Sequence, residues 1–376
     1  MDFTFNETQQ EVQQLANRIL GDLSTTERLN AIDKQDDRFD EPLWQQLAEA
    51  GLLGTAFSEE NGGMGFGFTE LCLFIEEVGR TVAAVPVVPV LVSAGLAIQQ
   101  FGSKAQQQRY LPRIAAGEAL LTAGLSEALA ECPTRPAARA SADGDSWCIS
   151  GAKIAVPFAD RAERVLLTAQ ADNGVVVVLV DPNAAGVTLT RQRSTTNEPW
   201  YELAMDKVRV AADDVLAGPD AGEQAARWIL ERTTAAYCAM QIGVADFSMR
   251  TTAQYTCERI QFDVPIGSFQ AVQHRAADCF IDVQCLKLTT YQAVSRLDAG
   301  KPASNEVLIA KIWAGDTGHR VSYAAQHLHG GTGIDKDYHL WRYCLWARQI
   351  EMQLGSSTAL LAELGKRIAA GQAYAE

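Results

Sequence analysis

The amino-acid sequence predicts an α+β fold that is mostly helical, with a small β domain between two helical domains. Apolar residues recur at helical spacing from residue 1 to about 120 and again from 219 to 376. Between these segments, short runs of β-forming residues alternate with polar turns. Because 376 residues are enough for two or three packed units, we predict domain boundaries of 1–120, 121–218 and 219–376.

The N-terminal segment is expected to contain several helices joined by a conspicuous loop. Apolar residues recur at helical spacing around residues 12–19 and over 43–53. Residues 58–67 are dense in glycine, which favours a loop. Another apolar-faced helix is predicted over 69–78, with Gly79 as its C-terminal cap.

The middle segment carries the β signal. The predicted strands are residues 146–150, 164–169, 174–181, 186–190 and 201–210. Turn sequences separate them, namely Asp143-Gly144, Asp172-Asn173-Gly174 and Asp181-Pro182.

The C-terminal segment returns to long helical patterns rich in alanine, leucine, glutamine and arginine. Breaks are predicted at Gly300-Lys301-Pro302 and at Gly330-Gly331-Thr332-Gly333. Pro265-Ile266-Gly267 must also interrupt any continuous helix there. We therefore expect several long helices in this domain.

The net charge and the cysteines indicate which binding partners and which cellular compartment to expect. The formal charge of −14 argues against duplex nucleic acid and anionic membranes as main partners. The eight cysteines form no C-x-x-C pair and no zinc-site spacing, so reduced thiols are expected. Neither a signal peptide nor a run of 18 apolar residues is evident, which favours a cytoplasmic protein.

Two C-terminal motifs carry a family resemblance. Residues 255–278, YTCERIQFDVPIGSFQAVQHRAAD, closely resemble the pattern R-x-x-F-G-x-P-I-x-x-x-Q-x-x-x-x-x-x-A-D. Residues 324–357 contain a Gly-Gly turn and a C-terminal G-[ST]-S element. Together with residues 50–65 and 109–127, these segments resemble the acyl-CoA dehydrogenase family over nearly the whole chain.

This resemblance implies a fold and a cofactor. Such enzymes have an N-terminal helical domain, a β-barrel-like middle domain and a C-terminal four-helix bundle. They form tetramers built from dimers, and FAD lies at the dimer interface. The flavin ring rests on the middle domain of one subunit, while the pyrophosphate and adenosine are held largely by the C-terminal domain of the other.

The resemblance places nucleotide-binding residues in the C-terminal domain. Arg259 matches the family's arginine for the FAD pyrophosphate, and a guanidinium makes paired, charge-assisted hydrogen bonds to phosphate. Gln270 matches a glutamine that binds the nucleotide half. Gly330 and Gly331 match a pair that lets the backbone approach the cofactor. His327 occupies the position where the family often has glutamine.

Arg259, Gln270 and His327 also have other interpretations. Arg259 could be an exposed helical arginine paired with Glu258 or Asp263. Gln270 could be an ordinary polar residue at a helix N-terminus. His327 and His329 could be metal ligands, although no companion cysteine or carboxylate pattern supports a metal site.

The catalytic base is missing from both places where the family carries it. Dehydrogenation needs a carboxylate that removes the proton next to the thioester. The usual glutamate position, before the G-[ST]-S element, is Leu354, and the alternative position on an earlier helix is Thr233. Glu351 could share a face with Leu354 if that segment is helical, whereas Glu231 lies about 200° from Thr233 around a helix.

The ring side of the flavin site also departs from the family. The T-E-P-x-A-G-S-D stretch that covers the ring is SEALAECPTRP (126–136) here, so Ser126 and Glu127 survive while the glycines and the aspartate do not. Ser126 is retained as a cofactor-binding candidate. The W-[IV]-[ST]-N element is replaced by residues 155–158, AVPF, which lack the tryptophan, the hydroxyl and, at Pro157, an N–H.

These departures lead to one hypothesis and two rivals. The chain is predicted to be a non-catalytic subunit that completes the FAD site of a related subunit carrying the glutamate. Its sequence at 329–343, HGGTGIDKDYHLWRY, resembles α2β2 members of steroid side-chain degradation, so the expected substrate is a bulky acyl-CoA. Electron-transferring flavoprotein is the acceptor that the family implies. The rivals are a self-sufficient dehydrogenase with a relocated base and a non-enzymatic binding protein on the same scaffold.

Overall fold

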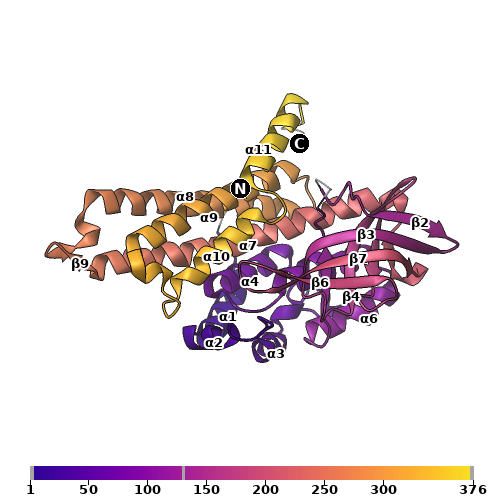
Figure 1. The fold of residues 1–376 in the computed structure, drawn as a ribbon, viewed down its shortest axis with the longest axis horizontal. Helices are drawn as coiled ribbons and strands as arrows, with labels where there is room; N and C mark the ends of the chain where they lie inside the picture. Colours follow the sequence, from indigo (N-terminus) through magenta and orange to yellow (C-terminus); the bar gives the residue numbers. More distant parts are fainter. Residues whose placement is uncertain (1–3, 129–131, 373–376) are drawn as a thin grey trace. The chain divides into compact units, whose positions relative to one another are not determined.

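The computed structural model describes residues 4–128 and 132–372. The part of the stretch 126–136 that lies at residues 129–131 falls outside this description. The chain forms two compact units, which are described separately (Figure 1). The helical unit comprises residues 1–34, 68–83 and 234–376, and the sheet unit comprises residues 35–67 and 84–233.

The predicted order of helices, strands and helices is confirmed. The first segment contains α1 (Glu7–Leu23), α2 (Thr26–Ile32), α3 (Glu41–Glu49), α4 (Phe68–Thr81), α5 (Ala97–Phe101) and α6 (Lys104–Ala115). Short helices η1 (Leu52–Gly54), η2 (Glu59–Asn61) and the π-helix η3 (Val88–Leu96) lie between them. The glycine-dense loop thus includes one short 3-10 turn, η2.

All five predicted strands occur, and the sheet also contains three that the sequence pattern did not reveal. The strands are β1 (Leu121–Gly124), β2 (Arg139–Asp143), β3 (Ser146–Pro157), β4 (Arg164–Ala171), β5 (Gly174–Val180), β6 (Val187–Arg193), β7 (Pro199–Val210) and β8 (Val215–Ala217). Their order is β6-β7-β3-β2-β4-β5-β8, and β1 pairs in parallel with β4. Alternate residues of these strands form one apolar core.

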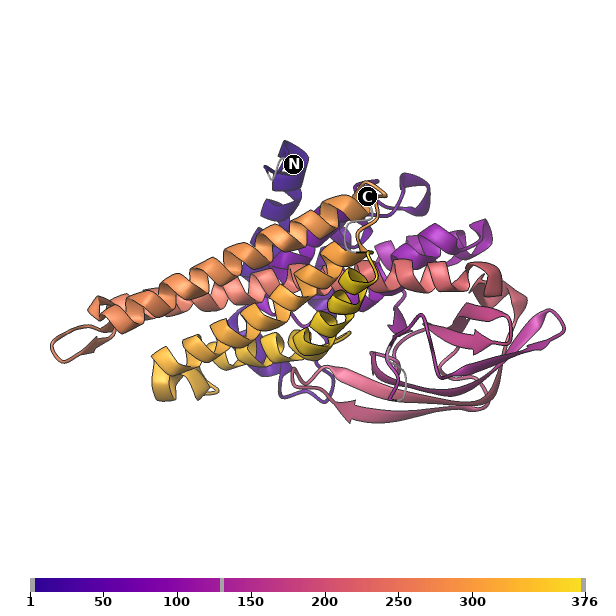
Figure 2. The ribbon, with the colours of Figure 1, turned by 90° about the horizontal axis from the view of Figure 1, so that it is seen from above.

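The C-terminal segment consists mainly of long helices. These are α7 (Pro219–Glu258), α8 (Gln270–Asp298), α9 (Ser304–His329), α10 (Leu340–Met352) and α11 (Ser357–Ala369). Figure 2 shows α8 and α9 running side by side. The predicted breaks at 265–267, 300–302 and 330–333 all lie between helices, which confirms them.

Gly79 has a different role from the predicted one. It lies inside α4, which continues to Thr81, so it is not a C-terminal cap. A Cβ at Gly79 would come within 2.0 Å of the Met240 carbonyl oxygen, and a Cβ at Gly243 within 1.9 Å of the Glu76 carbonyl oxygen. The two glycines therefore let the backbones of α4 and α7 touch, a contact that hydropathy patterning cannot reveal.

Buried polar groups tie α4 to α7 and α8 within the helical unit. The Tyr291 hydroxyl on α8 donates to the Glu76 carboxylate at 2.7 Å. Arg80 pairs with Glu76, with Glu77 and with Asp246 of α7. Burial raises the pKa of Glu76 despite the nearby cations. This network is structural, because every group in it is held by another residue of the same unit.

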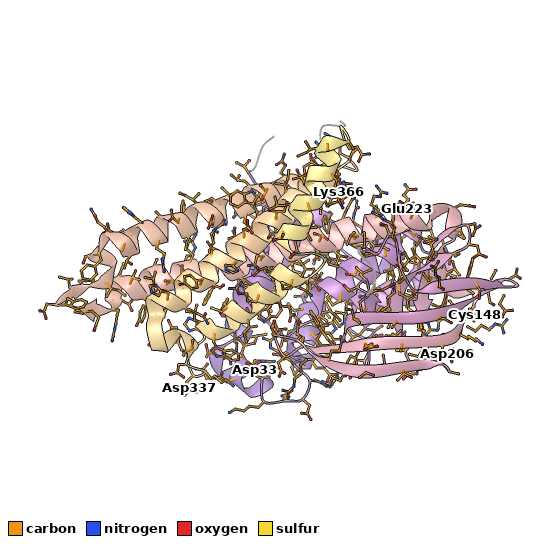
Figure 3. The ribbon with its side chains drawn as sticks, turned by 45° about the horizontal axis from the view of Figure 1, so that its top comes forward. Asp33, Cys148, Asp206, Glu223, Asp337 and Lys366 are labelled. Carbon is orange, nitrogen blue, oxygen red and sulfur yellow. The ribbon has the colours of Figure 1, made fainter. Side chains whose placement is uncertain are left out.

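Across residues 4–128 and 132–372, none of the helices combines the length and the hydropathy that crossing a bilayer requires. Three of the charged side chains labelled in Figure 3, namely Asp206 on β7, Glu223 on α7 and Lys366 on α11, are exposed and lie on different elements. The eight cysteines are free thiols.

Candidate functional site

A strained, exposed hairpin connects α7 to α8. Its two short strands are β9 (Ile260–Gln261) and β10 (Val264–Pro265), and Figure 1 shows it at the far end of α8. Phe262 and Asp263 at the tip have φ angles of 54° and 63°. Phenylalanine rarely adopts left-handed backbone, and this ring is 86% exposed. Strain combined with an exposed aromatic ring is typical of a segment that contacts something outside the chain.

Arg259 stands at the base of this hairpin with its charge free. Its backbone is fixed, since the N–H donates to Tyr255 and the carbonyl accepts from Ile266 at 2.9 Å. The side chain is exposed, and no ion pair to it exists among residues 4–128 and 132–372. Glu258 instead accepts a hydrogen bond from Gln254. The plainer interpretation, an arginine neutralised by its neighbours, is therefore not what the structure shows.

Gln270 is the first residue of α8, on the other side of the hairpin from Arg259. Its side chain is exposed, and its predicted place after a helix break is observed. The N-cap Phe269 supplies no side-chain acceptor, so the first N–H groups of α8 have no side-chain cap. Arg259 and Gln270 thus flank the hairpin at one end of the helical unit.

Gly330 and Gly331 begin the turn η6 (Gly330–Ile334) that ends α9. Gly330 has φ of 58°, which favours glycine. Gly331 has no positive φ, and a Cβ on either glycine would meet no atom of this chain within 4 Å. Any close approach that requires glycine at 331 must therefore involve a molecule outside this chain.

His327 takes part in a cluster that sequence reasoning did not find. Its Nδ1 lies 2.7 Å from Arg275 Nη1 on α8. The rings of His327 and Tyr323, one helical turn apart on α9, are nearly parallel, at 2°, with centroids 6.2 Å apart. The Arg275 guanidinium also lies 5.8 Å from the Tyr323 ring centroid. Tyr323 could have been found from its i, i+4 spacing to His327, whereas Arg275 could not, because its partner is on another helix.

This contact brings the predicted nucleotide residues to one end of the helical unit. Arg275 lies five residues after Gln270, about 8 Å along α8. His327 is three residues before Gly330 at the end of α9. The start of α8 and the end of α9 therefore meet where Arg275 contacts His327.

His329 belongs to the interior and not to this cluster. Its ring is buried, Nδ1 lies 2.9 Å from the Ala325 carbonyl oxygen, and Nε2 lies 3.2 Å from the Tyr338 hydroxyl. It stacks on Tyr255 with centroids 4.1 Å apart. Burial lowers the pKa of His329. Within the described residues no group of three or more histidine, cysteine, aspartate or glutamate side chains is placed to hold a metal ion.

Leu354 occupies an unusual backbone position just after α10. Its φ is 54°, and Gly355 follows at 110°. The buried Lys311 of α9 donates to the carbonyls of Glu351 and Gly355 at 3.0 and 3.1 Å, which fixes the backbone on both sides of Leu354. Burial lowers the pKa of Lys311 to about 8. The loop is therefore rigidly placed, but the side chain at its centre is aliphatic.

Glu351 lies near Leu354 in sequence, but not in the arrangement expected for a continuous helix. It lies on α10, whereas Leu354 lies beyond the helix end in left-handed backbone, so the two do not share a helical face as considered above. The Glu351 carboxylate is 2.8 Å from Arg348 Nη1 and 3.4 Å from His319 Nδ1. It is engaged in an ion pair with Arg348 of the same helix.

Thr233, the alternative base position, is a buried residue of the sheet unit. Its hydroxyl lies 3.0 Å from the Ser93 hydroxyl of η3, and both side chains are 2% exposed. Glu231 lies two residues earlier on the same helix, α7, about 200° around its axis. Ser126 also lies in the sheet unit, so it and Thr233 are not grouped with the nucleotide residues of the helical unit.

Ser126 and Glu127 have structural contacts in the sheet. The Ser126 carbonyl accepts from Ile154 N–H at 2.9 Å, forming an isolated bridge. Glu127 pairs with Lys153, and the two side chains are 4% and 0% exposed. Glu127 also accepts from the Ala138 N–H. This glutamate therefore neutralises a buried lysine.

The element that replaces W-[IV]-[ST]-N is folded inward. Ala155 has φ of 52°, and its N–H donates to Gln192 Oε1 at 2.8 Å, at an irregularity between β3 and β7. Phe158 is 1% exposed, and its ring packs edge-on against Phe39 with centroids 5.9 Å apart. Pro157 has no N–H to donate. An aromatic ring is thus present, but it belongs to the core of the sheet unit.

Comparison with known proteins agrees with this architecture. Residues 6–118 match the acyl-CoA dehydrogenase N-terminal domain and residues 220–369 the acyl-CoA dehydrogenase C-terminal domain. Acyl-CoA dehydrogenase FadE27 of Mycobacterium tuberculosis is 35% identical over 377 residues, covering 98% of this chain and 99% of that protein. The chain belongs to the acyl-CoA dehydrogenase family.

Two solved structures are similar over the same extent. A variant of the Tcur3481-Tcur3483 steroid ACAD matches with a TM-score of 0.91 and 39% identity, covering 98% of this chain and 99% of that one. The ChsE4-ChsE5 complex from Mycobacterium tuberculosis matches with a TM-score of 0.93 and 36% identity at the same coverage. Both are heteromeric by name.

Family membership confirms the predicted enzyme class. Acyl-CoA dehydrogenases are FAD-dependent oxidoreductases that act on CH–CH bonds, and FAD is the cofactor typical of the family. The helical, β and helical order is the family fold. The individual roles of Arg259, Gln270, His327, Gly330, Gly331 and Ser126 remain predictions.

Proposed function

We propose that this chain is a non-catalytic subunit of an acyl-CoA dehydrogenase and completes the FAD site of a related subunit that carries the catalytic glutamate. The observation that carries the proposal is Leu354. This leucine holds the base position in a well-fixed loop, and a hydrocarbon side chain cannot accept a proton. Thr233, at the alternative position, is a buried hydroxyl engaged with Ser93.

The ring-binding surface of this chain does not fit a flavin. The family uses an exposed tryptophan and a hydroxyl there, whereas this chain has Ala155, Pro157 and a buried Phe158. The N–H of Ala155 is used by Gln192, and Glu127 is used by Lys153. These groups leave few donors for a flavin ring on this subunit.

The nucleotide-binding end fits its half of FAD well. Arg259 is a free guanidinium beside a hairpin, Gln270 is exposed at a helix N-terminus, and Gly331 faces open space. A diphosphate would satisfy the guanidinium with paired hydrogen bonds. FAD, when bound, supplies the acceptor for the hydride that leaves the substrate. This chain's residues would bind and orient its pyrophosphate and adenosine.

The Leu354 loop and the nucleotide-binding residues are well separated within one chain. Lys311, which holds the Leu354 loop, lies sixteen residues before His327 on α9. At 1.5 Å per residue this is about 24 Å along the helix axis. The base position and the nucleotide residues would therefore belong to two different sites of an assembly, and only the second keeps its functional groups.

Exposed apolar side chains support a partner subunit over a solitary chain. They gather on the hairpin and along α8, and they include Ile260, Phe262, Phe269, Phe280, Ile281 and Leu288. Apolar side chains exposed to water in such number mark an interaction surface. The named relatives with known structures are heteromeric, which favours a related dehydrogenase subunit as the partner.

The substrate would be a CoA thioester with a bulky acyl group, in keeping with the steroid ACAD among the similar structures. The pocket for this acyl group and the catalytic base would lie on the partner subunit. Electron-transferring flavoprotein is the acceptor expected from the family. This chain would contribute nucleotide contacts and structural support.

Exchanging one carboxylate tests whether this chain supplies a base. In the complex with the related subunit, Glu351→Gln should leave kcat within about twofold, because the glutamine keeps a hydrogen bond to Arg348 and removes no reacting group. Glu363→Gln, which alters a comparable helical ion pair with Arg367 on α11, is the matched control. A hundredfold loss of kcat in Glu351→Gln alone would show that this chain has a relocated base.

A further inference from the structure

The contact between Arg275 and His327 determines which proton the histidine carries. A guanidinium has only donors, so the Nδ1 atom 2.7 Å from Arg275 Nη1 must act as the acceptor. A ring that accepts at Nδ1 is neutral and carries its proton at Nε2. A doubly protonated ring would place two donors against each other.

The ring is also held in orientation. Tyr323 lies one helical turn earlier with its ring parallel to the imidazole within 2°. Arg275 lies over Tyr323 at 5.8 Å, so a single cation contacts both rings. None of the three side chains is buried, so their arrangement faces whatever covers this end of α8 and α9.

We infer that Arg275 is a positioning residue that makes His327 a fixed Nε2–H donor toward the anionic, nucleotide half of the cofactor. This inference rests on the function proposed above. The family's glutamine at this position presents an amide N–H without help, because an amide nitrogen is always a donor. An imidazole offers a donor or an acceptor according to its tautomer, so replacing glutamine by histidine requires a second residue that selects the tautomer.

Charge supports an anionic ligand at this end. Arg259 and Arg275 lie on the two segments that flank the hairpin, in a chain whose formal charge is −14. Within residues 4–128 and 132–372, no carboxylate forms an ion pair with Arg275. Its guanidinium therefore keeps its full charge beside the imidazole.

The tautomer can be measured directly in the full-length chain. With ¹⁵N-labelled histidine, the five histidines are resolved and His327 is assigned by its loss in His327→Gln. At neutral pH we expect Nε2 protonated and Nδ1 unprotonated, and Arg275→Met should shift the signals toward a mixture of tautomers. Arg348→Met, which removes a similar contact to His319, should leave the His327 signals unchanged. An Nδ1-protonated His327 in the unaltered chain would overturn the inference.

A double-mutant cycle on the complex links the tautomer to the cofactor. The release rate of FAD is followed by its fluorescence for the unaltered complex, Arg275→Met, His327→Gln and the double variant. Arg275→Met should speed release about tenfold, the effect of one hydrogen bond of about 1.4 kcal/mol. It should have little effect in the His327→Gln background, because glutamine needs no tautomer selection.

The cycle separates this inference from the proposed function. Equal acceleration by Arg275→Met in both backgrounds would mean that Arg275 acts on the cofactor directly and that the inference is wrong. An unaltered complex that contains no FAD would contradict the proposed function, whereas the tautomer measurement would still test the role of Arg275.

Discussion

Arg259→Ala in the assembled enzyme should remove most of the bound FAD. The side chain is a free guanidinium that is held by a fixed backbone, and we expect it to make charge-assisted hydrogen bonds to the pyrophosphate. Hydrogen bonds to charged groups contribute about 1.5–3 kcal/mol, so FAD affinity should fall about ten- to a hundredfold. Flavin absorbance per complex after gel filtration measures the loss.

A second arginine on the same helix serves as the control. Arg250 is 67% exposed on α7 and pairs with Asp246 within the chain. Arg250→Ala should keep the full flavin content, because this arginine is neutralised by its own helix. If both variants retain FAD equally, the nucleotide site is not where we propose it.

Lys153→Met should destabilise the sheet unit strongly. The lysine and Glu127 form an ion pair whose side chains are 0% and 4% exposed. Removing the cation leaves a buried carboxylate without its partner, which costs about 3–5 kcal/mol. Urea denaturation of the full chain, followed by circular dichroism, should show the midpoint moving to lower denaturant concentration. Burial lowers the pKa of Lys153, so the desolvation of this amine is already unfavourable.

Two further variants show that the effect comes from the buried charge. Lys104→Met disrupts an ion pair with Glu60 whose side chains are 70% and 63% exposed, and it should cost less than about 1 kcal/mol. Adding Glu127→Gln to Lys153→Met should recover part of the lost stability, because it removes the unpaired charge. A Lys153→Met chain as stable as Lys104→Met would contradict the structural role of this pair.

The sequence predicted the elements that depend on local patterns. The helix break at 265–267 was predictable because proline and glycine disfavour the interior of a helix, and five strands were predictable from β-branched runs. Three strands were missed. Strand β2 (Arg139–Asp143) is polar and mostly exposed, β8 has three residues, and β1 is a short buried run that follows a helix. Their pairing depends on neighbours far away in the sequence.

The residues of the candidate site also fall into those that local sequence identifies and those that depend on contacts between distant segments. Arg259, Gln270 and the glycine pair are candidates that a resemblance identifies by their positions along the chain, and their roles stay predictions. Arg275 could not be identified in this way, since its contact with His327 joins α8 and α9 across 52 residues. The role of Gly79 was wrongly predicted for the same reason, because the backbone of α7 that touches it lies 161 residues later.

Helical spacing alone did not predict where Glu351 lies relative to Leu354. Glu351 was a reasonable substitute on a continuous helix, but α10 ends at Met352 and Leu354 adopts left-handed backbone. Lys311 fixes this change of direction through the Glu351 and Gly355 carbonyls. The backbone on both sides of Leu354 is therefore held by a buried lysine on another helix.

Flavin content and dehydrogenase turnover, measured on this chain alone and after co-expression with a related subunit that carries the glutamate, test the central claim most directly. We expect this chain alone to be colourless and inactive, and the complex to be active with about one FAD for each pair of chains. The reason is that, in our proposal, this chain keeps the nucleotide-binding half of an FAD site and has lost the ring-binding half. A chain that is yellow and oxidises acyl-CoA by itself would contradict it. A colourless and inactive complex would contradict it as well.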